Sequence, residues 1–128
     1  MERLRVLVVE DNAIIGMLLA EMLTAMGHLV CGVEATEAGA IEAAARWHPD
    51  LMIVDAELRE GNGLLAMKSI LSSGPMPHVI MSGAVTGTGI LDGPVLQKPF
   101  GEKDLVRAME RATQAKGAPG ATVSLLNA

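Results

Sequence analysis

Short apolar runs that alternate with segments of helical periodicity constrain the fold of this chain more than any other feature. The runs are apolar on consecutive residues, which is typical of strands that are buried on both faces. These predicted strands cover residues 4–9, 28–33, 51–54, 79–81 and 94–97. Apolar residues then recur at helical spacing, which predicts helices over residues 13–26, 37–48, 64–71 and 102–115. Because strands alternate with helices, we expect an α/β fold with a parallel sheet covered by helices on both faces.

The length of the chain sets the number of domains. A chain of 128 residues, half of them apolar, has room for one domain with a real core. We expect that domain to cover residues 1–116. The sequence Gly-Ala-Pro-Gly-Ala begins at Gly117 and predicts a flexible tail over residues 117–128.

Charge and aromatic content exclude several classes of protein. The formal net charge is −5, and there is no basic stripe of the kind that binds nucleic acid. The single Trp, the single Phe and the absence of Tyr leave few platforms for stacking bases. The one Cys excludes an internal disulfide, and no apolar run approaches the ~18 residues of a membrane span. We therefore expect a cytoplasmic protein that binds neither nucleic acid nor a membrane.

Polar side chains stand where the predicted strands end. In an open parallel sheet, ligands bind at the carboxyl ends of the strands. The residues found there are Glu10, Asp11, Asp55, Ser82 and Lys98. Three carboxylates close together repel one another unless a cation joins them, and oxygen ligands suit Mg²⁺. With a lysine and a hydroxyl nearby, this set is typical of phosphoryl transfer through a carboxylate nucleophile.

Several short motifs together resemble the receiver domain of bacterial two-component response regulators. The resemblance covers roughly residues 3–115. It rests on the motifs Val8-Val9-Glu10-Asp11-Asn12, Ile53-Val54-Asp55 followed by Leu58 and Gly63, Met81-Ser82-Gly83, and Lys98-Pro99-Phe100. The fold that it implies is flavodoxin-like and doubly wound, a five-stranded parallel sheet in the order 2-1-3-4-5.

The resemblance also implies a role for each residue of the acidic set. Asp55 is similar to the phosphoacceptor, which takes a phosphoryl group from a histidine kinase or a histidine phosphotransfer protein. Glu10, Asp11 and Asp55, with the backbone carbonyl of Ala56, correspond to the ligands of Mg²⁺. Such a protein is a phosphoacceptor with at most slow autodephosphorylation, and we expect no dedicated enzyme activity.

The lysine and the serine have implied roles as well. Lys98 is expected to pair with the phosphoryl oxygens, and Ser82 to donate a hydrogen bond to them and report their presence by moving. The Lys98–Pro99 peptide bond is expected to be cis. Signalling would then proceed through protein–protein contacts with a downstream target, and we expect a monomer or a weak dimer.

Two features depart from the usual pattern of the family. Residues 83–93 include Gly83, Gly87, Gly89 and Gly93, so we expect the fourth helix to be short or missing, as in stand-alone receivers of the short-loop type. Val95 stands where receivers often carry the aromatic residue that transmits the movement of the serine, which predicts an altered relay. We expect the region of the fourth helix and the last helix to form the partner surface.

Two other functions remain open from the sequence. The first is a pseudo-receiver adaptor that keeps the fold but acts independently of phosphorylation. The second is an aspartyl phosphatase of the dehalogenase type, which would need a general acid two residues after the nucleophile. Glu57 stands at that position, and the Gly-Thr that usually follows is missing.

Overall fold

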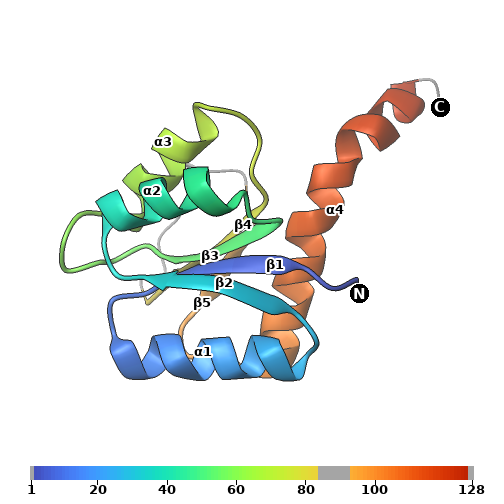
Figure 1. Cartoon of the computed structure of the whole chain (residues 1–128). Helices are drawn as coiled ribbons and strands as arrows, with labels where there is room; N and C mark the ends of the chain where they lie inside the picture. Colours follow the sequence, from blue (N-terminus) through green and yellow to red (C-terminus); the bar gives the residue numbers. More distant parts are fainter. Residues whose placement is uncertain (1, 84–92, 127–128) are drawn as a thin grey trace.

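The computed structural model describes residues 2–83 and 93–126, with side chains up to residue 114. Its helices and strands alternate along the chain as the sequence predicts (Figure 1). In chain order they are β1 (Arg5–Val9), α1 (Ala13–Ala25), β2 (Leu29–Glu34), α2 (Glu37–Trp47), β3 (Leu51–Asp55), α3 (Gly63–Leu71), β4 (His78–Ser82), β5 (Val95–Gln97) and α4 (Glu102–Leu126).

The strands form one parallel sheet in the order β2-β1-β3-β4-β5, which confirms the predicted flavodoxin-like topology. The order reverses direction between β1 and β3, and ligands bind beside such a switch point in doubly wound sheets. In the register of the sheet, Val9 pairs with Val54 and Asp55 pairs with Met81. The residues that follow β1, β3 and β4 therefore emerge at one edge.

The core has two layers because successive residues of a strand face opposite sides of the sheet. Val6 and Val8 pack with residues of α1 and α4 on one face. Leu7 and Val9 pack with residues of α2 and α3 on the other face. Figure 1 shows α2 and α3 together on one side of the sheet and α1 on the opposite side. Because the strands are buried on both faces of the sheet, their sequences are apolar at consecutive residues.

Side-chain caps begin two of the helices, α1 and α2. The side chain of Asn12 accepts hydrogen bonds from the backbone N–H groups of Ile14 and Ile15, at 3.0 Å each. The hydroxyl of Thr36 accepts one from the N–H of Gly39 at 3.0 Å. These bonds satisfy N–H groups that have no partner within the first turn of a helix. Asn12 thereby starts α1 directly after the acidic pair.

The last helix differs from its prediction. Gly117, Pro119 and Gly120 are poor helix formers, so the sequence predicts an end near residue 115. In the structure α4 continues to Leu126 and extends beyond the sheet (Figure 1). The division into a domain of residues 1–116 and a tail of residues 117–128 stays a prediction. The predicted short or missing fourth helix lies outside the described residues.

Among the described residues, no helix is both long enough and apolar enough to cross a membrane.

Candidate functional site

The carboxyl edge of the sheet brings together the side chains that the sequence singles out. Glu10 follows β1, Asp55 ends β3, Ser82 ends β4 and Lys98 follows β5. Glu10, Asp55 and Ser82 are each no more than 3% exposed. Charged and polar groups are rarely buried this far unless they are paired or hold an ion.

Three carboxylates form the centre of the site. One oxygen from each of Glu10, Asp11 and Asp55 lies within 4.8 Å of the others. Burial, together with the nearby charge of Asp55, raises the pKa of Glu10 from 4.5 to about 6, although the N–H of Asn12 opposes this rise. The Oε1 atom of Glu10 is buried and has no hydrogen-bond partner among the described residues. An unpartnered buried oxygen in a group of three carboxylates fits a hard cation such as Mg²⁺.

Lys98 places a positive charge beside two of these carboxylates. Its Nζ atom donates a hydrogen bond of 2.7 Å to Oδ2 of Asp55 and lies 3.6 Å from Oε1 of Glu10. Burial alone would lower the pKa of Lys98, but the hydrogen bond to Asp55 and the charges of both carboxylates raise it above 10.5. Lys98 is therefore charged at neutral pH. The Lys98–Pro99 peptide bond is cis, as predicted.

Asp11 is held by the loop that follows β3. The backbone N–H of Arg59 donates to its Oδ2 atom at 2.7 Å, and Nε of Arg59 lies 3.8 Å from the same oxygen. The N–H of Arg59 is the main reason that the pKa of Asp11 is lowered from 3.8. Arg59 is not among the residues predicted from the sequence, because nothing in the sequence spacing places this loop against Asp11.

The backbone around the proposed acceptor is closely packed. The N–H of Glu57 donates to Oδ1 of Asp55 at 2.9 Å. The carbonyl of Ala56 accepts a hydrogen bond from the N–H of Gly63 at 3.2 Å, so one lone pair of this predicted metal ligand is already used. A Cβ atom on Gly63 would overlap the carbonyl oxygen of Asp55. Glycine at the start of α3 is thus required by the position of the acceptor.

The hydroxyl of Ser82 donates a hydrogen bond to Oε2 of Glu57 at 3.0 Å. Oε1 of Glu57 also accepts the backbone N–H of Gly83 at 3.4 Å. Glu57 therefore links the loop after β3 to the end of β4.

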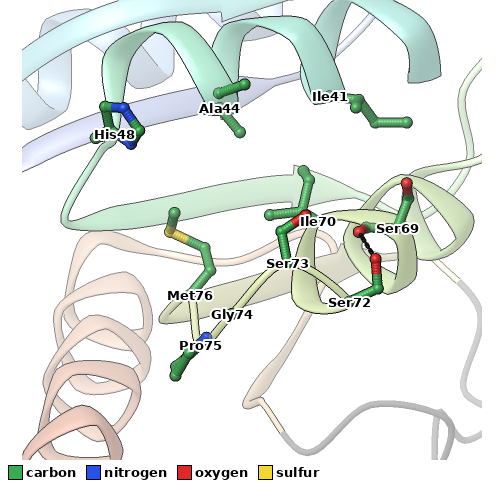
Figure 2. A pocket seen from close by; sticks show the side chains of 11 residues that line it. Ile41, Ala44, His48, Ser69, Ile70, Ser72, Ser73, Gly74, Pro75 and Met76 are labelled. Carbon is green, nitrogen blue, oxygen red and sulfur yellow. Dashed lines mark hydrogen bonds between the residues drawn. The ribbon is translucent and has the colours of Figure 1, made fainter.

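Two cavities lie away from the acidic cluster. The first, of about 380 Å³, lies between α2 and α3; Ile41, Ala44, Ile70 and Met76 line it, with His48 at one end (Figure 2). It is found where both helices end, at the amino edge of the sheet. The second, also of about 380 Å³, lies between β5 and α4 and includes Val95 in its lining. Neither contains a residue of the acidic cluster.

Comparison with known proteins agrees with this geometry. The family model of the response regulator receiver domain matches residues 6–110. The chain belongs to the response regulator receiver family.

Individual relatives and structures point the same way. The chain is 34% identical over 115 residues to the transcriptional regulatory protein PdtaR of Mycobacterium tuberculosis, covering 84% of this chain. It is 26% identical over 117 residues to the chemotaxis protein CheY of Thermotoga maritima, covering 86% of this chain and 98% of CheY. The solution structure of the Erythrobacter litoralis PhyR receiver domain matches with a TM-score of 0.77 and 28% identity, over 88% of this chain and 91% of that one.

The chain spans only part of several relatives. It covers 56% of PdtaR and 23% of a protein-glutamate methylesterase of Geobacter metallireducens to which it is 39% identical over 80 residues. The methylesterases match this chain only in their receiver part. Receiver domains in general bind Mg²⁺ at an acidic cluster and interact with kinases and downstream targets.

Proposed function

We propose that this chain acts as a response regulator receiver that accepts a phosphoryl group on Asp55 with Mg²⁺ and signals through protein–protein contacts. The observation that carries the proposal is the contact of 2.7 Å between Lys98 Nζ and Asp55 Oδ2 inside a cluster of three carboxylates. A buried carboxylate that contacts a lysine, beside acids that can hold a metal ion, is suited to receive a negatively charged group.

In the proposed reaction, a carboxylate oxygen of Asp55 attacks the phosphorus of a phosphohistidine on the donor protein. A new O–P bond forms while the P–N bond breaks, and the imidazole nitrogen keeps the electron pair of that bond. Lys98 balances the charge of the phosphoryl oxygens, and Ser82 donates a hydrogen bond to one of them. Hydrolysis of the product by water is expected to be slow, because no described side chain is placed as a dedicated base.

The metal fits the residues present. Glu10, Asp11 and Asp55 would hold Mg²⁺, and the backbone carbonyl of Ala56 remains a proposed further ligand. Bound there, Mg²⁺ would neutralise charge on the acidic cluster and on the incoming phosphoryl oxygens. The raised pKa of Glu10, which reflects its burial, would then return toward its ordinary range.

An apolar surface on α1 adjoins this site and suits the donor protein. Ile14, Met17 and Leu18 are 65%, 53% and 52% exposed. The helix begins directly after Asp11 and Asn12, so a protein that delivers a phosphoryl group to Asp55 would also cover this surface. The partner is therefore proposed to be a sensor histidine kinase or a histidine phosphotransfer protein. The partner surface predicted from the region of the fourth helix lies mostly outside the described residues.

The test is phosphorylation by a small donor. The protein is incubated with acetyl phosphate and Mg²⁺, and intact-protein mass spectrometry measures the gain of one phosphoryl group. We expect a gain that disappears in Asp55→Asn and on removal of Mg²⁺ with a chelator. A wild-type protein that gains nothing would support the pseudo-receiver adaptor instead. Steady turnover of p-nitrophenyl phosphate would support the aspartyl phosphatase.

A further inference from the structure

Glu57 occupies a position that the phosphorylation chemistry above does not use. Its backbone N–H is bound to the acceptor Asp55, at 2.9 Å, while its carboxylate reaches the end of β4. There it accepts the hydroxyl of Ser82 at 3.0 Å and the N–H of Gly83 at 3.4 Å. Ser82 is 3% exposed, so its hydroxyl depends on protein groups for hydrogen bonding.

In the proposed reaction, the hydroxyl of Ser82 has to donate its hydrogen bond to a phosphoryl oxygen instead of to Glu57. A serine hydroxyl has one proton and can donate one full hydrogen bond at a time. To donate to a phosphoryl oxygen on Asp55, Ser82 has to leave Oε2 of Glu57. A bond to a charged carboxylate is among the stronger hydrogen bonds of a protein, so its loss opposes phosphorylation.

The negative charge of Glu57 also opposes phosphorylation of Asp55. The carboxylate of Glu57 lies two residues from the acceptor, and a phosphoryl group would add about −1.5 to −2 units of charge beside it. Like charges in a partly buried site repel one another. Replacement by glutamine separates the two effects, because an amide keeps an oxygen that accepts a hydrogen bond but removes the charge.

We propose that Glu57 is a positioning residue that holds Ser82 in the resting state and so limits how readily Asp55 takes and keeps a phosphoryl group. This inference rests on the proposed function of Asp55. Glu57 competes with the phosphoryl group for one proton, and the phosphorylated state forms when Ser82 exchanges one acceptor for the other.

The experiment measures the dissociation constant of beryllofluoride, a phosphoryl mimic, with saturating Mg²⁺. Wild type is compared with Glu57→Ala, Glu57→Gln, Ser82→Ala and the double variant of Glu57→Ala with Ser82→Ala. We expect Glu57→Ala to bind the mimic about tenfold more tightly than wild type, the size of one hydrogen bond to a charged group. Glu57→Gln should show a smaller gain. In the Ser82→Ala background, Glu57→Ala should tighten binding of beryllofluoride only by the part of the gain that comes from removing the negative charge.

A matched control uses Glu60→Gln, which removes one charge from an exposed residue of the same loop. Equal effects of Glu57→Ala with and without Ser82 would overturn the inference, as would an equal gain in Glu60→Gln. If these variants match wild type while acetyl phosphate still modifies Asp55, only the role of Glu57 fails. If wild type neither binds the mimic nor gains a phosphoryl group, the proposed function fails and this inference fails with it.

Discussion

At the scale of single residues, the positive charge of Lys98 compensates the negative charge of the acidic cluster. Its Nζ lies 2.7 Å from Asp55 and 3.6 Å from Glu10, two carboxylates that are buried in the same small volume. Without the ammonium, both would face one another with no cation, and uncompensated buried charges destabilise a fold.

We expect Lys98→Met to lower the free energy of unfolding by about 2 kcal/mol, the scale of leaving buried polar groups unpaired. Urea unfolding in the presence of a chelator measures this loss. Added Mg²⁺ should restore part of the stability of the variant, because it supplies positive charge to the same carboxylates. An unchanged midpoint in the chelator would contradict the role assigned to Lys98.

His28 makes stability depend on pH. It is 6% exposed, and its Nδ1 atom accepts the backbone N–H of Leu4 at 3.0 Å, which only the unprotonated nitrogen can do. Burial lowers the pKa of His28 below 6.5 in the folded protein. The unfolded chain therefore binds the proton more readily, and the folded state loses stability as pH falls below 6.5.

The variant His28→Asn tests this dependence, because an amide oxygen can accept the N–H of Leu4 and does not titrate. Between pH 7 and 5, wild type should lose stability relative to the variant, by at most about 1.4 kcal/mol per pH unit for one proton. Glu10 contributes with the opposite sign, since its pKa of about 6 is raised, but it is present in both proteins. Parallel curves of unfolding free energy against pH would contradict the prediction.

At the scale of elements, the junction of β3 and α3 sets the position of the acceptor. Asn62 caps α3 by accepting the N–H groups of Leu64 and Leu65 at 2.7 and 3.1 Å. Glu37 at the start of α2 accepts the N–H of Asn62 at 2.9 Å. The loop between Asp55 and Gly63 is thus fixed by the cap at the start of α3 and by the contact with Glu37 of α2.

We expect Gly63→Ala to destabilise the protein by about 2–4 kcal/mol, because the added Cβ would overlap the carbonyl of Asp55 and force the backbone to move. Phosphorylation by acetyl phosphate should slow as well. Gly83→Ala is the control, since a Cβ there has no atom of the described residues within 4 Å. Thermal unfolding with similar midpoints for both variants would show that the close approach is not required.

At the scale of the whole molecule, the apolar core and the candidate site occupy different parts of the sheet. Both faces bury apolar side chains against helices, and the carboxyl edge carries the acids, the serine and the lysine. Among the described elements, α4 alone reaches beyond this arrangement (Figure 1).

Truncation after Lys116 tests the predicted boundary of the domain. Among the α4 side chains that the structure describes, which end at residue 114, the buried ones are those of Leu105, Ala108, Met109 and Ala112. We expect the shortened protein to unfold within about 0.5 kcal/mol of the full chain, as is usual for changes outside the core. A loss of several kcal/mol would show that residues 117–128 pack against the domain.

The sequence by itself determined the topology and the composition of the site. Double burial produces consecutive apolar runs, and parallel strands place their carboxyl ends at one edge, so Glu10, Asp55, Ser82 and Lys98 could be assigned together. The order of the strands, which brings these ends together, was implied by the resemblance to receiver domains, and the structure confirms it. Sequence patterns alone could not supply the length of α4, because weak helix formers do not always end a helix.

The tertiary structure decided which groups bond within that edge. Arg59 holds Asp11, and Glu57 holds Ser82, contacts that join residues 48 and 25 positions apart. Neither pair has a periodic signal, since both depend on the path of the loop between β3 and α3. That path follows from caps and close approaches among residues distant in sequence, and these form only when the sheet has brought its strand ends together.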